Sequence, residues 1–420
     1  MTILQVNEIP EDVNFNSTIE IISNNVNYFT HGFFKYPCKF IPQIPRWAIL
    51  KYTKPKDWVL DPFAGSGTTL VEAVLNNRNA VGIDFDKFSQ LLCEVKTTHL
   101  FLEQIELLKK IKNTLFLNDE HIQPFKPDLH NVAHWFPPQN ILDLGLLRSK
   151  IERVYQETND RDIYKFLLVC FASIIRKCSW ADDVSPKPYV SRRIKKEPSS
   201  VKEAFLRIFE TYIKRIEEYK VENLGRAITI LGDARQIDIQ DYISKVSLAV
   251  TSPPYINAFD YVRSLRLENA WLGFYGDSKI IEMKKKQVGT EIIPHQLYAE
   301  GVEKTGNKRL DDILTKIEKK DIKRAYIVKK FFEDMGKNIE EVNKLLKLGG
   351  HYIIVIGDSK IRGVHIPTHE ILIDIAKERG FELSNVFSYI IKNRYLRIPR
   401  SGRGGLIKKD QVVDIVKRED

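Results

Sequence analysis

The stretch WVLDPFAGSGTTLVEAVLNNRNAVGID, residues 58–84, decides the fold. Residues 58–60 are a short apolar run, residues 61–67 form a glycine-containing turn, and residues 68–76 carry apolar side chains at helical spacing. A second apolar run, residues 80–83, ends in an acidic residue. Strand, helix and strand within about thirty residues predict a βαβ crossover and therefore a parallel sheet.

The sheet pattern resumes near residue 226 and continues to the end of the chain. We expect strands at 227–231, 247–250, 351–356, 385–392 and 411–417, and helices at 44–52, 326–347 and 367–379. Residues 1–30 are polar and irregular, so no element is expected there. The chain is therefore predicted to be an α/β protein with a Rossmann-like, mostly parallel sheet.

Two segments differ from this pattern. Long helical patterns dominate residues 88–225, and they enclose a polar, basic loop. Residues 277–325 are charged and irregular, which marks a second variable segment. We therefore assign 1–100 and 226–420 to one domain and 101–225 to a mainly helical insertion.

Bulk composition excludes several classes of protein. The chain has 420 residues and a formal net charge of +10, which is compatible with a polyanionic partner and equally with a solvated basic surface. Its four cysteines form no CxxC pair and show no zinc spacing, so a cytoplasmic protein without a metal site is expected. The N-terminus has no apolar signal region, and no run is long enough to span a membrane.

The turn at residues 61–67 has the chemistry of an adenosine-cofactor site. Gly65 and Gly67 let the backbone bend sharply and approach a ligand, and the following helix presents its N-terminal amides. Asp84 can accept both ribose hydroxyls, and Asp233, at the end of a later strand, can accept from the adenine amino group. Neither a GxGxxG dinucleotide motif nor a Walker motif is present.

A second turn, Ser252-Pro253-Pro254-Tyr255, follows another predicted strand. Two successive prolines cannot continue a central strand, so they fix a rigid turn with free carbonyls. The Ser252 hydroxyl and the Pro253 carbonyl can each accept one N–H of a nucleobase amino group and aim its lone pair at an electrophilic methyl. Tyr255 can stack on the base, which must first leave the duplex.

At these motifs the sequence resembles the N4-cytosine/N6-adenine amino-methyltransferase family of DNA methylases. The resemblance rests on DPFAGSGTT (61–69), GID (82–84), GDA (232–234) and TSPPY (251–255), and it covers roughly residues 30–100 and 226–400. HGFFKYPCKFIPQIP resembles the motif that precedes them, and GGHYIIVIGD (349–358) resembles a later strand. The helical insertion between the second and third cofactor motifs departs from the common motif orders, so the segment that recognises DNA stays open between residues 100–225 and 277–325.

The resemblance implies a fold, a cofactor and a reaction. The fold is a seven-stranded, mostly parallel class I methyltransferase sheet with a terminal antiparallel hairpin, and the cofactor is S-adenosyl-L-methionine. Phe33 and Lys39 would flank its methionine part. The remaining predicted cofactor residues are Asp61, Pro62, Phe63, Gly65, Ser66, Gly67, Thr68, Asp84, Phe85, Asp233 and Ala234. The SPPY form favours N4-cytosine as the target in double-stranded DNA, with N6-adenine as the alternative.

Other functions fit less well. A carbon-5 cytosine methylase needs a Pro-Cys nucleophile after the cofactor motif, whereas Pro37-Cys38 precedes it. An RNA amino-methyltransferase, or a non-enzymatic DNA-binding subunit with a degenerate cofactor fold, remains an alternative. Candidate DNA contacts are the basic side chains Arg192, Arg193, Lys195, Arg394, Arg397 and Arg400. A cognate restriction endonuclease is a further partner that the resemblance allows, and the sequence leaves the oligomeric state open.

Overall fold

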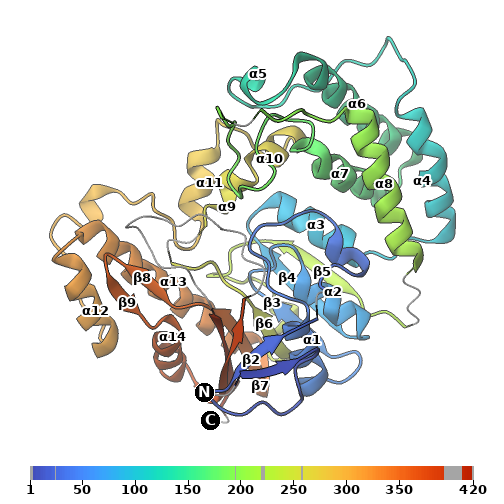
Figure 1. Ribbon diagram of the computed structural model, residues 1–420. Coiled ribbons are helices and arrows are strands. Elements are labelled where there is room, and N and C mark those ends of the chain that lie inside the picture. The colour runs from blue at the N-terminus through green and yellow to red at the C-terminus, as the bar shows by residue number, and fades with distance from the viewer. Residues whose placement is uncertain are drawn as a thin grey trace.

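The computed structural model describes residues 3–23, 25–193, 195–218, 223–256, 259–391 and 409–418. Its main sheet has nine strands: β1 (Ile3–Val6), β2 (Thr18–Ile21), β3 (Trp58–Asp61), β4 (Asn79–Asp84), β5 (Ala227–Leu231), β6 (Val246–Thr251), β7 (Leu346–Ile356), β10 (Phe381–Ile390) and β11 (Lys409–Lys417). They lie in the order β1-β2-β10-β11-β7-β6-β3-β4-β5. Figure 1 shows helices around this sheet and a separate helical unit above it.

Seven of these strands form the sheet that was expected. β5, β4, β3, β6 and β7 are parallel neighbours. β11 then runs antiparallel to both β7 and β10, which gives the terminal hairpin. The mostly parallel α/β fold with a reversed last hairpin is therefore confirmed.

The expectation that residues 1–30 contain no strand is wrong. β1 and β2 extend the sheet beyond β10, where Thr18 and Ile19 pair in parallel with Ser388 and Tyr389. Each of these strands has only four residues, which is too short for a period-two pattern to stand out. Their stability comes from pairing at the existing edge, and this tertiary effect leaves no local signal in the sequence.

Helices cover both faces of the sheet because successive strand residues point to opposite sides. Val59 packs on the face that carries α1 (Gln43–Tyr52) and α2 (Thr68–Leu75). Leu60 packs on the other face, with α13 (Ile322–Leu345) and α14 (Thr368–Lys377). Each fully buried aliphatic side chain contributes roughly 1.5–3 kcal/mol, so the two apolar layers hold the strand ends in fixed positions.

The mainly helical segment forms its own apolar core, which includes Phe166, Phe205 and Trp271. Its helices are α4 (Leu102–Thr114), α5 (Val132–Trp135), α6 (Pro138–Thr158), α7 (Arg161–Ile175) and α8 (Val201–Glu218), joined by α9 (Tyr261–Ser264) and α10 (Arg266–Leu272). Side chains of α3 (Lys87–Thr97) pack into the same core and connect it to the sheet. Because α9 and α10 follow the SPPY turn, that turn lies between the two units.

Residues 277–325 are more regular than expected. They contain α11 (Ile280–Lys286), α12 (Lys308–Glu318) and the start of α13. α12 buries Leu310, Ile313, Leu314 and Ile317, whose i, i+3, i+4, i+7 spacing is an amphipathic-helix signal that the charged flanks obscured. A small hairpin of β8 (Ser359–Ile361) and β9 (Val364–Ile366) lies nearby, and the short 3-10 helices are η1 (Phe29–Gly32), η2 (Gln240–Tyr242) and η3 (His295–Leu297).

Among the described residues, no helix has the length and apolar character that crossing a membrane requires.

Candidate active site

A cavity of about 880 Å³, measured to its open mouth, lies at the carboxyl ends of β3, β4, β5 and β6. This is the edge of a parallel sheet at which α/β proteins bind ligands. The cavity is lined by Tyr36, Cys38, Lys39, Phe40, Pro62, Phe63, Ala64, Gly65, Ser66, Thr68, Asp84, Phe85, Asp86, Gly232, Asp233, Ala234, Ser252, Pro254, Tyr261, Val262, Leu265, Tyr275, Lys286 and Val288. Residues of both predicted turns therefore line one cavity.

The glycine turn connects β3 to α2. Gly65 has φ +50° and Gly67 has φ +75°, a left-handed conformation that residues with a Cβ rarely adopt. A Cβ on Gly67 would also lie only 3.0 Å from Cys93 Sγ. Gly67 caps α2, so the helix begins at the cavity, with Thr68 as its first residue. This arrangement gives the cavity free backbone amides.

Two acids at the end of β4 lie against this turn. The Asp84 carboxylate accepts hydrogen bonds from the Gly65 and Asp86 amides, both at 2.9 Å. Burial raises the pKa of Asp84 to about 6. Burial, together with the neighbouring Asp84 charge, raises the pKa of Asp86 to about 7. Asp86 also caps α3 through the Phe88 and Ser89 amides. Two acids with raised pKa values in one cavity mark a site that is prepared for a ligand.

Asp61 connects the glycine turn to the SPPY turn. Its Oδ1 accepts from the Thr251 hydroxyl at 2.7 Å and from the Phe63 amide at 3.1 Å. Its Oδ2 is buried and has no hydrogen-bond partner within the described ranges. Burial raises the pKa of Asp61 to about 6, against the hydrogen bond from Thr251. Asp61 does not line the cavity, and its contacts fix the relative positions of the two turns.

Asp233 lines the cavity beyond β5, but its carboxylate already has a partner. Oδ1 accepts from Arg235 Nε at 2.9 Å, and Oδ2 lies 2.6 Å from a second guanidinium nitrogen of the same residue. Burial opposes ionisation, but the Arg235 hydrogen bonds outweigh it and lower the pKa of Asp233. The sequence did not point to Arg235. Arg235 follows the candidate acid Asp233 by two residues, and this position is the signal that could have identified it.

The SPPY turn follows β6. Ser252 and Pro254 line the cavity, and Pro253 is buried. Tyr255 is partly exposed and packs against the apolar layer under the sheet. Burial and the nearby Asp410 carboxylate raise its pKa, whereas a contact with the Ser252 side chain opposes the shift. Tyr255 is not among the residues that line the cavity, but its side chain interacts with that of Ser252, which does line it.

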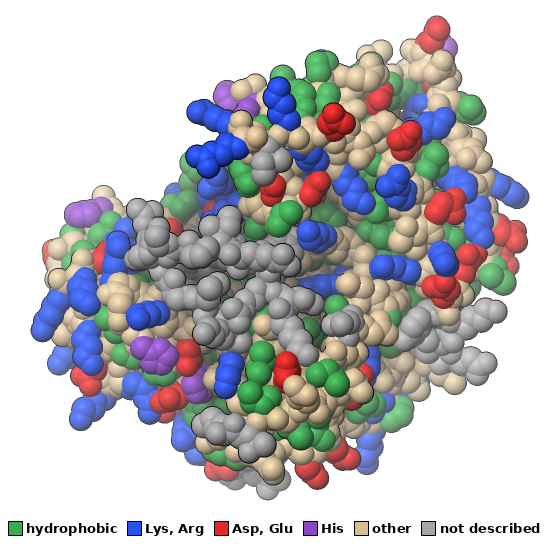
Figure 2. All heavy atoms as spheres, in the orientation of Figure 1, with side chains coloured by type: hydrophobic (Ala, Val, Ile, Leu, Met, Phe, Trp, Pro, Cys, Tyr) green, Lys and Arg blue, Asp and Glu red, His purple; other side chains and the backbone are tan. Residues whose placement is uncertain are grey.

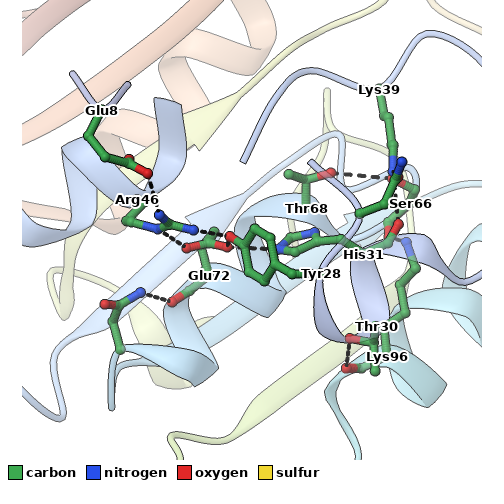
Figure 3. A network of polar contacts seen from close by, with 12 residues as sticks. Glu8, Tyr28, Thr30, His31, Lys39, Arg46, Ser66, Thr68, Glu72 and Lys96 are labelled. Carbon is green, nitrogen blue, oxygen red and sulfur yellow. Dashed lines mark hydrogen bonds and ion pairs between the residues drawn. The ribbon is translucent and has the colours of Figure 1, made fainter. Parts of the chain in front are cut away.

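A polar network fixes the segment that leads into the cavity from the N-terminal side (Figure 3). Glu72 on α2 is buried and accepts from His31 Nε2 at 2.7 Å and from Arg46 Nε at 3.0 Å. Tyr28 bonds both Glu72 and Arg46. Arg46 also bonds Glu8 at 2.9 Å. Burial lowers the pKa of His31 to about 4, so its ring is neutral near pH 7.

Two lysines extend this network to the glycine turn. Lys39, which lines the cavity, donates to the His31 carbonyl at 2.8 Å, and burial lowers its pKa to about 8. Lys96 on α3 is buried and donates to the Ser66 carbonyl at 2.8 Å. Thr30 donates to the Lys96 carbonyl at the same distance. The segment and the turn are thereby tied to the same helix, as Figure 3 shows.

The predicted position of Phe33 does not agree with the structure. Phe33 is fully buried in the helical unit and stacks on Tyr212 with ring centroids 4.0 Å apart. Tyr36 and Phe40 line the cavity instead, three and seven residues further along the same motif. Residues 33–40 contain four aromatic side chains, so the sequence alone could not show which of them would line the cavity.

Other lining residues were missed because they belong to the helical unit or its junction. Tyr261 and Tyr275 flank α9 and α10, and both reach the cavity. Burial, with smaller effects from nearby acids, raises the pKa of both hydroxyls. No motif marks these tyrosines, since the fold of the insertion alone brings them to the sheet edge.

The candidate DNA contacts fall into two groups. Arg192, Arg193 and Lys195 are exposed in the loop between α7 and α8. The predictions for Arg394, Arg397 and Arg400 lie outside the described residues. Their flanking strands end at Ile390 and begin at Lys409, which pair with each other at the same sheet edge as the SPPY turn.

The cavity fits S-adenosylmethionine by its chemistry. Asp84 would accept the ribose hydroxyls, Phe63 and Phe85 would contact the adenine, and the turn amides with Lys39 would meet the carboxylate. The unpaired acids would also favour the positively charged sulfonium.

This chain is similar to one known family and to several Type II methyltransferases. A family described as DNA methylase matches residues 7–92. The Type II methyltransferase M.MvaI of Kocuria varians is 24% identical and covers 94% of this chain and 91% of its own length. The Type II methyltransferase M.BsoBI of Geobacillus stearothermophilus is 23% identical, with 92% and 85% covered. A solved SAM-dependent methyltransferase from Methanosarcina mazei is 10% identical, with 89% and 97% covered and a TM-score of 0.31.

The matched residues include the N-terminal segment, the glycine turn and the acids after β4, and the Type II relatives match over nearly the whole chain. The chain is therefore similar to the N4/N6 amino-methyltransferase family of DNA methylases, and this similarity supports S-adenosylmethionine as its cofactor.

Proposed function

We propose that this DNA methyltransferase transfers the methyl group of S-adenosylmethionine to the exocyclic N4 of a cytosine that has been flipped out of double-stranded DNA. The observation that carries the proposal is the shared cavity: Ser252 and Pro254 line it together with Gly65 and Asp84. The target amino group and the methyl donor would therefore meet in one enclosed space.

The chain's own residues position the amino group. The Ser252 hydroxyl and the Pro253 carbonyl each accept one N–H, which turns the nitrogen lone pair toward the cofactor side of the cavity. Tyr255 stacks on the base and keeps its plane fixed. The bound cofactor supplies an electrophilic methyl group. Transfer is direct, because the amino nitrogen itself attacks the methyl group, and none of the cysteines after the glycine turn has the preceding proline of a Pro-Cys nucleophile.

Serine in place of an acid favours cytosine. Ser252 is a neutral acceptor at the position where adenine enzymes of the family more often carry aspartate. The SPPY form is associated in the family with N4-cytosine methylation, and the Ser252 hydroxyl can accept one N–H of the cytosine amino group. N6-adenine remains the alternative product and is distinguished by the experiment below.

Double-stranded DNA is the proposed substrate, and basic side chains flank the cavity face. Figure 2 shows Lys and Arg side chains on the helical unit at the upper left and on the part formed by α12, β8 and β9 at the lower left. Exposed basic residues of the helical unit include Arg192, Arg193 and Lys195, and those of the part formed by α12, β8 and β9 include Lys308, Lys360 and Arg362. Cations on both sides of a base-flipping cavity would hold the phosphates of the bent duplex.

The relatives are Type II methyltransferases, and we propose the same role in modification for this chain. A cognate endonuclease would then cleave the unmodified recognition sequence. Protection of DNA in cells that express both proteins would test that pairing separately from the chemistry.

The test of the activity is product identification. The protein is incubated with isotope-labelled S-adenosylmethionine and plasmid DNA, and the nucleosides are separated and analysed by mass spectrometry. Labelled N4-methyldeoxycytidine is the expected product. Labelled N6-methyldeoxyadenosine would show that adenine, and not cytosine, is the target base. Label found in RNA alone would overturn the proposal that DNA is the substrate.

A further inference from the structure

A proton must leave the target nitrogen when the methyl group arrives, and a serine hydroxyl is a poor final acceptor for it. A buried carboxylate, whose pKa is raised by burial, is a much better proton acceptor. The family form with aspartate in the turn would have an acid at this place, whereas here Ser252 stands there. The SPPY turn therefore needs an acid from elsewhere, provided that the proposed function is right.

Asp410 lies beside this turn. It is the second residue of β11 and pairs across the hairpin with Tyr389 of β10. Its side chain is 5% exposed, and Oδ2 accepts from the Tyr389 hydroxyl at 2.8 Å. No ion-pair partner is found for it within the described part of the chain. A buried carboxylate without a cation costs free energy, so its retention calls for a function.

Oδ1 of Asp410 is buried and has no hydrogen-bond partner among the described residues. The Tyr255 side chain interacts with the Asp410 carboxylate and with the Ser252 side chain. Tyr255 therefore connects the catalytic serine to a buried acid that has an oxygen without a partner.

We propose that Asp410 is a positioning residue that receives the departing proton through Tyr255. As the N4–methyl bond forms and the sulfur–methyl bond breaks, the sulfur keeps the bonding electron pair and N4 becomes positively charged. N4 then gives one proton to Ser252 Oγ, Ser252 gives its own to the Tyr255 oxygen, and Tyr255 gives its own to Asp410. Asp410 later releases the proton to water, so no additional reactant is required.

The electrostatics of the cluster support this direction of transfer. Burial raises the pKa of Asp410, with the hydrogen bonds from Tyr389 and Tyr255 acting against the shift. A carboxylate of higher pKa is a stronger base and can hold the proton transiently near neutral pH. Among the described residues, the titratable groups that interact with Asp410 are Tyr389 on β10 and Tyr255 after β6. Neither is a cation that would lower its basicity.

The kinetic test compares single-turnover methyl transfer at saturating cofactor in wild type, Asp410→Asn and Tyr255→Phe. Both variants should lose about 100-fold in rate, the lower range for general acid–base catalysis, and the double variant should lose no more. The wild-type rate should fall at acidic pH as Asp410 becomes protonated, and this pH dependence should be absent in Asp410→Asn. Wild-type rates in either variant, or additive losses, would overturn the proposal.

Asp414→Asn is the matched control. Asp414 is a buried acid on the same strand and bonds Tyr52 at 2.6 Å and His351 at 2.7 Å, away from the SPPY turn. Its transfer rate should stay at the wild-type value. If Asp410→Asn does not fold, Tyr255→Phe and its pH profile decide alone.

Stability gives a readout that does not depend on activity. Because the pKa of Asp410 is raised in the folded state, its ionisation destabilises the fold at high pH, and this cost disappears as the pH falls below the unfolded-state value. Asp410→Asn should therefore have a higher Tm than wild type at pH 8, with a smaller difference at pH 4. A variant that is less stable at every pH would identify Asp410 as a structural acceptor. Failure of wild type to methylate DNA would instead remove the proposed function.

Discussion

Glu72 and Asp84 are carboxylates that follow the same glycine turn, one on α2 and one at the end of β4, but their surroundings differ. Glu72 accepts from His31, Arg46 and Tyr28, and these partners lower its pKa although burial opposes them. Asp84 accepts from backbone amides and pairs with no cation among the described residues, and burial raises its pKa to about 6. Glu72 is therefore satisfied by the protein itself, whereas Asp84 retains capacity for a ligand.

The difference separates two functions in a small volume. The Glu72 network holds the segment containing Lys39 against α2, so it stabilises the fold around the cavity (Figure 3). Asp84 and Asp86 are acids with raised pKa values in the cavity where the cofactor is proposed to bind. Such groups lower stability in the free protein and are retained for binding.

The largest effect is expected for Glu72→Ala. Removing this carboxylate leaves Arg46 and His31 without their buried acceptor, and breaking a buried pair costs about 3–5 kcal/mol. The free energy of unfolding, measured in urea, should fall by that amount. Glu72→Gln keeps two hydrogen-bonding atoms and should lose less. A loss below about 1 kcal/mol for Glu72→Ala would contradict the structural function of the network.

Asp84→Ala should affect binding more than folding. Two hydrogen bonds from ribose hydroxyls to a charged group are lost, so the Kd for S-adenosylmethionine should rise about 10- to 100-fold. The measurement is calorimetric titration, with Asp312→Ala on the exposed side of α12 as the control. An unchanged Kd in Asp84→Ala would remove Asp84 from the cofactor site.

Cofactor affinity should also depend on pH. Asp84 accepts hydrogen bonds from the ribose only when it is ionised, and its pKa in the free protein is about 6. Binding is therefore complete above this value and weakens as the pH falls through it. The Kd should rise roughly tenfold between pH 7.5 and pH 5. A Kd that is independent of pH across this range would mean that Asp84 does not have to be ionised.

The smallest effect is expected for Tyr28→Phe. The tyrosine hydroxyl bonds both Glu72 and Arg46, but these two side chains also bond each other. Its removal should cost about 1 kcal/mol in urea unfolding and leave the cofactor Kd unchanged. A loss as large as that of Glu72→Ala would show that the hydroxyl holds the network together.

The glycine turn and its strands could be predicted because their signals are local. The expected strand at 58–60, helix at 68–76 and strand at 80–83 differ from β3, α2 and β4 by one or two residues. Short apolar runs with a glycine turn between them have few alternative structures. Gly65, Asp84, Ser252 and Asp233 accordingly line the cavity, as the motifs suggested.

Contacts between distant segments could not be predicted. Tyr261 reaches the cavity only because the helical unit packs onto α3, and Asp410 meets Tyr255 only because β11 lies in the sheet beyond β7. In the sequence, Glu72 is a single polar residue within an apolar helix, because its hydrogen-bond partners lie 26 to 44 positions away. These residues acquire their chemistry from the tertiary fold.

The central claim is that one cavity holds the methyl donor and presents the target amino group to it. The most direct measurement compares Ser252→Ala and Tyr255→Ala with wild type for two quantities, cofactor Kd and single-turnover methyl transfer to DNA. The account predicts an unchanged Kd and a transfer rate lower by about 100-fold or more, because the donor still binds while the amino group is no longer held. Transfer at the wild-type rate in either variant would contradict it.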